Sequence, residues 1–253
     1  MKPKLVIDTF TIVENPVWTC PSCNSNTLSI KKDCFHFEHD AASIHIEHSD
    51  DSCTPLELGG VFSAILNCLN PKCGEVVSCN GSGFWDVEYD TYENLESYYS
   101  YYVPKFFYPT LRPIQISNTW PLKVKEALLA SFSLVCVNAS SASNLLRVAV
   151  ESMLDDQRIP IKKEITSNGK KKLVRAELAW RLTQLGKQRT RQMQDLLDAL
   201  RHMGNSGSHK FGSVDPSDVL QGYEVFEYVL IEIYPEPSNV VMTASQLTSK
   251  YKN

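Results

Sequence analysis

The segment Cys68-Leu-Asn-Pro-Lys-Cys73-Gly74 and the earlier segment Cys20-Pro-Ser-Cys23 decide how the N-terminal part of the chain folds. A short turn between two cysteines presents both sulfurs to one ion, and two such knuckles complete a tetrahedral set of ligands. A proline within each knuckle, and glycine after the second, favour tight turns. We therefore predict a structural zinc site, with no coordination position left for catalysis, made of Cys20, Cys23, Cys68 and Cys73.

The other cysteines leave the ligand set open. Seven of the eight cysteines lie in the first 79 residues, and Cys136 stands apart. Because the chain starts without the apolar run of a signal peptide, we expect reduced thiols or metal ligands rather than disulfides. Cys34, Cys53 or Cys79 could replace a proposed ligand, and a set of buried free thiols is the simpler alternative. A redox role for the first knuckle is disfavoured because no strand–helix–strand pattern surrounds it.

The composition is that of a globular protein. The 253 residues are 43% hydrophobic and 21% charged, which excludes a disordered chain, a collagen and a coiled-coil rod. A net charge of −4 excludes a uniformly basic nucleic-acid coat. No stretch approaches the roughly 20 apolar residues of a membrane span. We expect a cytoplasmic protein that makes no membrane contact.

The first 115 residues have a β-like pattern. Residues 35–39 and 44–48 each alternate apolar and polar side chains, and residues 40–43 join them. This predicts a hairpin that buries Phe35, Phe37, Ile44 and Ile46. On its other face, His36 and His45 with Glu38 and Glu47 could hold a second metal, although a solvated surface is the simpler interpretation.

Further along, residues 61–66 and 75–79 are predicted strands, and Asn80-Gly-Ser-Gly83 is a predicted turn. Tyrosine and phenylalanine are frequent from Tyr89 to Tyr108. Pro104, Pro109 and Pro113 disfavour a helix in and directly after this stretch. We interpret residues 103–116 as an extended connector. Its aromatic rings could stack on nucleic-acid bases, although packing between two domains is the more common role of such a stretch.

After Trp120 the apolar residues recur at helical spacing. We predict four amphipathic helices: one from Pro121, one capped by Ser140 or Ser141 and ended by Pro160, one over 173–203 that breaks near Gly186, and one opening at Asp215. Residues 161–172 are a predicted basic loop. The predicted fold is α+β, with a zinc-ribbon-like domain over 1–115, a four-helix bundle over 116–237 and a flexible tail over 238–253.

Charge is distributed unevenly between these parts. Residues 1–120 carry 7 Lys or Arg against 15 Asp or Glu, whereas residues 157–210 carry 13 against 4. The two parts therefore have different partners, or the acidic part docks onto the basic one. For the basic part the expected partner is a phosphate backbone, contacted by Lys170, Lys171, Lys172, Arg175 and Lys210.

Polar residues interrupt the apolar stripes of two predicted helices. Asn144, Arg147 and Glu151 share one face of the second helix, since they are three and four residues apart. The third helical region ends in Arg201-His-Met-Gly-Asn-Ser-Gly-Ser-His209. In the simplest interpretation Gly204 and Asn205 end the helix, His209 lies on the surface, and the arginine and glutamate of the second helix form an ordinary ion pair.

These segments, with Val219-Leu and Tyr234, resemble an uncharacterised bacterial family that joins a cysteine-knuckle segment to a HEPN-like helical domain and occurs in restriction and anti-phage defence loci. The resemblance covers residues 15–235 and is most specific over 200–209. HEPN domains are four-helix bundles, often homodimeric, and many are metal-independent endoribonucleases. Their motif is arginine, a polar residue, three variable residues and histidine; Asn205 and His209 match it, whereas Gly204 stands at the arginine position.

The resemblance implies a mechanism in which the RNA 2′-hydroxyl attacks its own phosphodiester. His209 would transfer the proton, Arg201 with Arg147 would neutralise the phosphate oxygens, Asn205 would orient the histidine or the phosphate, and Glu151 would hold Arg147. Two further functions stay open: a non-catalytic module that binds nucleic acid or a defence-system partner protein, and a structural adaptor.

Overall fold

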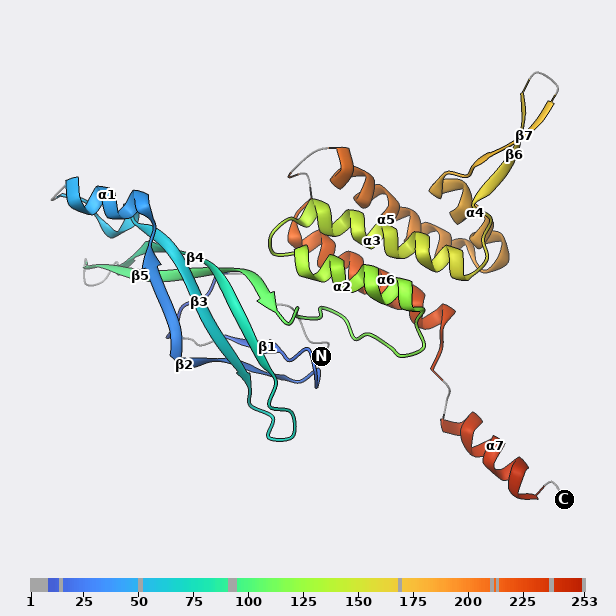
Figure 1. Ribbon diagram of the computed structural model, residues 1–253, viewed down its shortest axis with the longest axis horizontal. Coiled ribbons are helices and arrows are strands. Elements are labelled where there is room, and N and C mark those ends of the chain that lie inside the picture. The colour runs from blue at the N-terminus through green and yellow to red at the C-terminus, as the bar shows by residue number, and fades with distance from the viewer. Residues whose placement is uncertain are drawn as a thin grey trace.

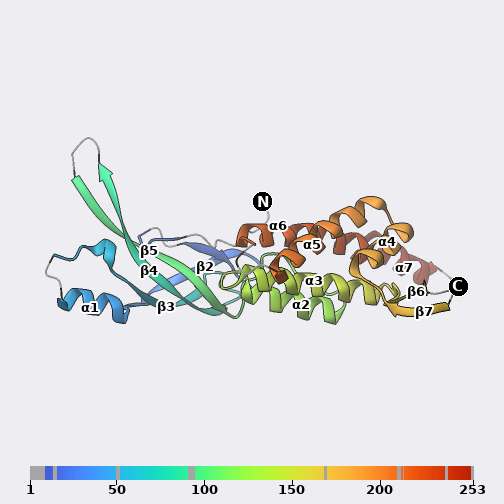
Figure 2. The ribbon, with the colours of Figure 1, turned by 90° about the horizontal axis from the view of Figure 1, so that it is seen from above.

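The computed structural model describes residues 9–13, 16–49, 52–90, 95–167, 170–209, 212, 214–236 and 239–251, with the backbone alone at 90, 95, 209 and 239–242. The described chain is α+β: a curled five-stranded antiparallel sheet and a helical bundle lie end to end (Figures 1 and 2). It contains seven α-helices and one short 3-10 helix, Pro55–Glu57. Within this part of the chain, no helix combines the length and apolarity needed to cross a membrane.

The strands of the sheet follow one another in chain order, each antiparallel to the next. They are β1 (Val17–Thr19), β2 (Asn26–His39), β3 (Gly59–Cys68), β4 (Val76–Asp90) and β5 (Leu95–Tyr108). In β3, alternate residues are buried, so one face of the sheet carries the core. The strands predicted at 61–66 and 75–79 lie in β3 and at the start of β4.

Aromatic rings fill the inner face of the sheet. Phe10 packs edge-on against Trp18 and Phe62, with ring centroids 5.5 and 5.6 Å apart. The predicted turn at residues 80–83 is wrong, because these residues lie inside β4. A β-carbon on Gly81 would overlap the Val103 carbonyl oxygen and stand 2.6 Å from the ring of Phe62, so this glycine lets a neighbouring strand and a ring approach closely and does not serve a turn.

The predicted hairpin over residues 35–48 is also wrong. Its first half is the end of β2, but its second half is helix α1 (Ala41–Ser49). Asp40 precedes this helix, and its carboxylate accepts a hydrogen bond from the Ser43 amide at 2.9 Å. Ile44 is exposed rather than buried, because the helix lies at the far end of the sheet from the bundle (Figures 1 and 2).

The connector begins later than predicted, because residues 103–108 extend β5 and pair with β4. Residues 109–121 then lead to the bundle and bury Leu111, Ile114 and Trp120. The apolar core runs without interruption from the sheet through this connector into the helices.

The helical part contains α2 (Leu122–Leu134), α3 (Ala139–Asp156), α4 (Leu178–Gln188), α5 (Arg191–His209), α6 (Pro216–Ile233) and α7 (Asn239–Tyr251). Helix α3 packs against α2, α4, α5 and α6. Asn138, rather than Ser140 or Ser141, caps α3 and accepts from the Ser141 amide at 2.9 Å. The third predicted helix is two helices, because the chain turns at Arg189 rather than at Gly186.

Two segments predicted to be irregular are regular. Residues 161–172 do not form a loop: most of them belong to a hairpin of β6 (Lys162–Ser167) and β7 (Lys170–Arg175), which projects from the bundle (Figure 1). Asn168-Gly169 between the strands is a strong hairpin signal that the basic composition obscured. Residues 239–251, assigned to a flexible tail, form α7, which extends away from the bundle (Figure 1).

Candidate functional site

The four predicted cysteine ligands come from two turns at the same end of the sheet. The first turn follows β1, and the second joins β3 to β4. Asn24 and Gly74 take positive φ angles of 55° and 67°, which lets the backbone reverse its direction directly after each cysteine pair. The amide of Cys68 donates to the Glu75 carbonyl at 2.8 Å and closes the second turn.

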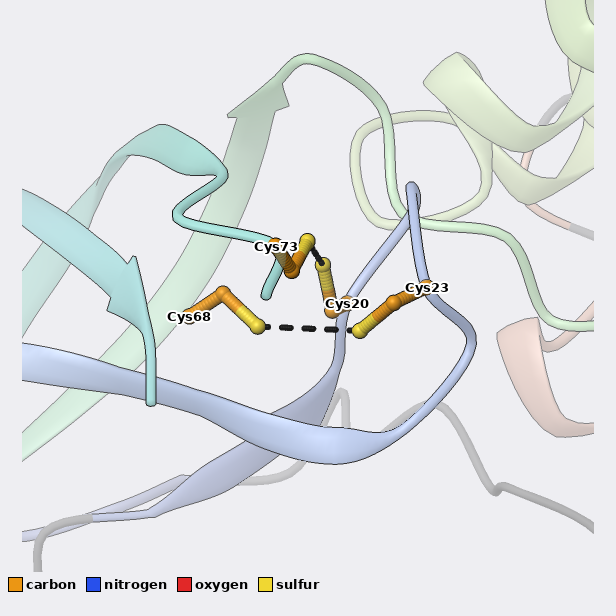
Figure 3. Close-up of side chains that lie close together, drawn as sticks. All are labelled: Cys20, Cys23, Cys68 and Cys73. Atoms are coloured by element: carbon orange, nitrogen blue, oxygen red, sulfur yellow. Dashed lines mark hydrogen bonds between the residues drawn. The ribbon is translucent and has the colours of Figure 1, made fainter. Parts of the chain in front are cut away.

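The sulfur atoms gather at one point (Figure 3). The Sγ atoms of Cys20 and Cys73 are 3.7 Å apart, and those of Cys23 and Cys68 are 3.6 Å apart. All four lie within 4.8 Å of one another. Thiolate–metal bonds of about 2.3 Å in a tetrahedron separate the sulfurs by about 3.8 Å. The four cysteines therefore have the spacing needed to hold a metal ion.

The thiols of this cluster differ strongly in acidity. A hydrogen bond from the Ser25 amide lowers the pKa of Cys23 to about 6, whereas burial raises the pKa of Cys20 to about 12. The hydroxyl of Thr27, 3.1 Å from the Sγ of Cys68, provides a further polar contact. A bound cation would displace the remaining thiol protons, since the thiolate is the metal ligand.

None of the alternative ligands joins the cluster. Cys34, Cys53 and Cys79 lie outside it, and burial raises the pKa of Cys79 to about 12. Within the part of the chain that the structure describes, no second group of three or more metal-ligating side chains comes together. His36 instead contacts Glu38 at 2.8 Å on an exposed surface, and His45 lies on α1.

Polar residues of α3 and α5 meet where the two helices cross. The guanidinium of Arg147 donates to the side-chain oxygen of Asn205 and, at 3.3 Å, to Glu151. One turn further along, the hydroxyl of Ser208 donates to Asn144 at 3.2 Å. Asn205 therefore does not end the helix but lies within α5, and the sequence-predicted residues of the two helices form one polar row.

Gly204 and Gly207 allow α5 to approach α3 closely. A β-carbon on Gly207 would lie 2.6 Å from the Ser140 carbonyl, and one on Gly204 would lie 2.9 Å from the Cβ of Arg147. A larger side chain does not fit at either position. Arg147 thus occupies the space beside Asn205 that an arginine at position 204 would need.

The remaining predicted residues are more dispersed. Arg201 points to its own helix, donating to Asp198 at 2.7 Å and contacting His202 at 2.7 Å. His209 is the last residue of α5, and its side chain lies outside the described part, as does the whole of Lys210. The other predicted nucleic-acid contacts lie on the projecting hairpin and are exposed: Lys170, Lys171, Lys172 and Arg175.

A groove of about 780 Å³ beside this row was not predicted from the sequence. It lies between α3, the base of the β6–β7 hairpin and the start of α4. Arg181 is buried at its edge and donates to Asp155 at 2.6 Å. The i+3 and i+4 spacing that revealed Arg147 and Glu151 also includes Asp155, but nothing in the sequence linked it to α4.

The fold and the cysteine cluster define an α+β protein with a candidate metal centre at the end of a curled sheet. Residues 8–107 match a sequence family described as Domain of unknown function (DUF8608), and residues 130–253 match one described as Domain of unknown function (DUF4145). The first match covers the sheet and the second most of the helices. No curated protein and no solved structure matches the chain.

Proposed function

We propose that this chain is a nucleic-acid-directed protein whose HEPN-like helical part binds RNA along the β6–β7 hairpin. The observation that carries the proposal is the charge of this projecting ribbon. Residues 162–175 contain six Lys or Arg and one Glu, and five of these cations are exposed. A narrow, basic ribbon fits between phosphate strands, and each cation that meets a phosphate releases a counterion.

Fluorescence anisotropy with a labelled single-stranded RNA tests this proposal. Replacing Lys170, Lys171 and Lys172 by Ala is expected to weaken binding at least tenfold and to lower the slope of log K against log salt by about 2. The control removes the same charge elsewhere: Lys31→Ala, Lys32→Ala and Lys123→Ala. Equal losses of RNA affinity in both triple variants would mean that only net charge matters and not the hairpin. Absence of RNA binding by the unaltered protein would exclude the proposed function.

A second candidate function is metal-independent RNA cleavage, which the contact between Arg147 and Asn205 favours. The RNA 2′-oxygen would bond to phosphorus while the P–O5′ bond breaks, leaving a cyclic phosphate and a 5′-hydroxyl. His209 would take the 2′ proton and a protonated group would supply the one gained by the leaving oxygen. Arg147 is the guanidinium beside Asn205, since Arg201 contacts Asp198.

Cleavage is tested with total RNA in EDTA, comparing the unaltered protein with His209→Ala and Arg147→Lys. Loss of cleavage in both variants with RNA affinity unchanged would support the enzyme. RNA binding without cleavage would leave the binding module as the function. The resemblance to defence proteins also predicts a homodimer, which a light-scattering measurement of the mass of the purified protein would detect.

The role proposed for the cysteine cluster is structural binding of zinc. Four thiolates close the coordination shell, so the ion fixes the two turns and leaves no position for a substrate. Metal analysis of the purified protein should give about one zinc ion per chain. A different ion, or none, would overturn the assignment.

A further inference from the structure

The groove between α3, the hairpin base and α4, which nothing in the sequence indicated, is lined by both charged and apolar side chains. It is formed by three elements that the chain brings together from residues 147–155, 161–162 and 175–181. With a volume of about 780 Å³ it is large enough for a nucleotide. Lys162 and Arg175 at the base of the basic hairpin line it, so a nucleic acid lying along the hairpin would reach it.

The carboxylates that line the groove are already engaged. Glu151 pairs with Arg147 at 3.3 Å, Asp155 with Arg181 at 2.6 Å, and Glu177 with Lys163 at 3.4 Å. These pairs weaken the repulsion that the three acids would otherwise exert on an anion.

The cations at the mouth of the groove are not engaged in the same way. Lys162 and Arg175 face each other across the hairpin register and form no ion pair with another described residue. Two cations on adjacent strands can bind one phosphate together, and Arg can do so with two parallel hydrogen bonds.

Arg181 adds a buried donor to the groove. Arg181 is 5% exposed, and one terminal nitrogen of its guanidinium donates to both the Asp155 carboxylate and the Ile159 carbonyl. Its Nε–H is buried and meets no acceptor among the described residues. The charge of Arg181 therefore lies inside the wall of the groove, where it offsets the Asp155 carboxylate, and Lys162 and Arg175 are the exposed cations that a ligand can reach.

An apolar surface completes the site. Ile161 is 57% exposed beside the buried Leu178 and lines the same groove. Such a surface suits the flat face of a base, while the cations suit a phosphate. Resting on the RNA binding proposed above, we infer that this groove holds one nucleotide unit, with its phosphate at Lys162 and Arg175 and its base against Ile161.

Calorimetry of the full chain with AMP and with adenosine tests the site, because only AMP carries the phosphate. We expect AMP to bind and adenosine to bind at least tenfold more weakly. Arg175→Ala should weaken AMP binding at least tenfold, whereas Lys123→Ala, which removes the same charge on α2 outside the groove, should leave it within twofold. Both side chains are exposed, so neither variant should affect folding.

Competition by AMP against the labelled RNA distinguishes the two sources of the nucleotide. Displacement of RNA by AMP, lost in Arg175→Ala, would assign the groove to a unit of the RNA. AMP binding without displacement would assign it to a free nucleotide. If RNA binds but AMP does not, or if Arg175→Ala and Lys123→Ala alter AMP binding equally, the groove site is overturned while the hairpin proposal stands. If AMP binds and RNA does not, the hairpin proposal fails and the groove site stands.

Discussion

The sheet builds its core largely from aromatic rings, whereas the bundle buries mainly aliphatic side chains around a buried hydroxyl pair. On the sheet side, Phe10, Trp18, Phe62 and Tyr102 pack edge to face, and the cysteine cluster at the strand ends could hold a metal ion. On the bundle side, helices approach closely at glycines and long apolar stripes fill the interior. The comparison sets a proposed metal cross-link in one half against close helix packing in the other.

Loss of a metal ligand should have the largest effect and should separate the two halves. Cys20→Ser is expected to abolish metal binding and to destabilise the sheet by on the order of 5 kcal/mol, because the binding free energy of such an ion is folding free energy. Hydrogen exchange resolved by peptide should show loss of protection in β1–β4 with α3 still protected. Cys34→Ser, outside the cluster, is the control. Full metal content in Cys20→Ser would contradict the ligand set.

The cysteine cluster could be predicted from sequence because each knuckle is local. With only two residues between them, Cys20 and Cys23 hold their sulfurs close together in any fold. The prediction therefore had to identify only which two turns come together. The polar row of α3 and α5 was partly predictable for the same reason, since Asn144, Arg147 and Glu151 share a helix face wherever that helix packs.

What failed depends on partners distant in the chain. Asn80-Gly-Ser-Gly83 has the composition of a turn, and its glycines are explained by the rings and the Val103 carbonyl that β2, β3 and β5 place against it. The alternation of Ile44-His-Ile-Glu-His48 suits a strand, but the Asp40 carboxylate at the Ser43 amide starts a helix. The groove at Arg181 joins three segments, and no local pattern connects them.

Close packing in the bundle is tested by a pair of glycines. Gly207→Ala places a methyl group against the rigid Ser140 carbonyl and should cost about 2 kcal/mol, despite a gain of up to about 1 kcal/mol in helix propensity. Gly186→Ala meets chiefly the movable side chain of Gln194 and should be neutral or stabilising. Urea unfolding followed by helix circular dichroism measures both. Equal effects would mean that the crossing of α3 and α5 is looser than described.

The buried hydroxyl pair should have a smaller effect. The Ser131 hydroxyl lies 2.7 Å from the Tyr223 hydroxyl and donates to the Ala142 carbonyl at 2.7 Å. Tyr223→Phe keeps the ring and removes one hydrogen bond, so it should destabilise the bundle by about 1 kcal/mol. Phe132→Leu, which removes the ring contact with Tyr223 but no hydrogen bond, separates packing from bonding. No change in the urea midpoint of Tyr223→Phe would show that the bond contributes nothing.

At neutral pH the smallest effect is expected from the titration of Cys79, because its thiol is then protonated in the folded and unfolded chain alike; the effect is visible only at alkaline pH. Burial raises the pKa of this thiol from 9.0 to about 12, so the folded protein keeps a proton that the unfolded chain loses. Stability linked to this thiol is complete below pH 9 and falls as the pH rises towards 12, by up to about 1.4 kcal/mol per pH unit. In Cys79→Ala the decline should be shallower by this amount.

The control for this titration is Val77→Ala, which opens space in the same strand without removing a titratable group. It should lower stability equally at pH 8 and pH 10.5, whereas the difference between Cys79→Ala and the unaltered protein should shrink between those values. Urea midpoints at the two pH values measure both variants. A parallel decline in all three proteins would mean that the thiol ionises in the folded sheet, and that this part of the sheet core is more accessible to water than its burial indicates.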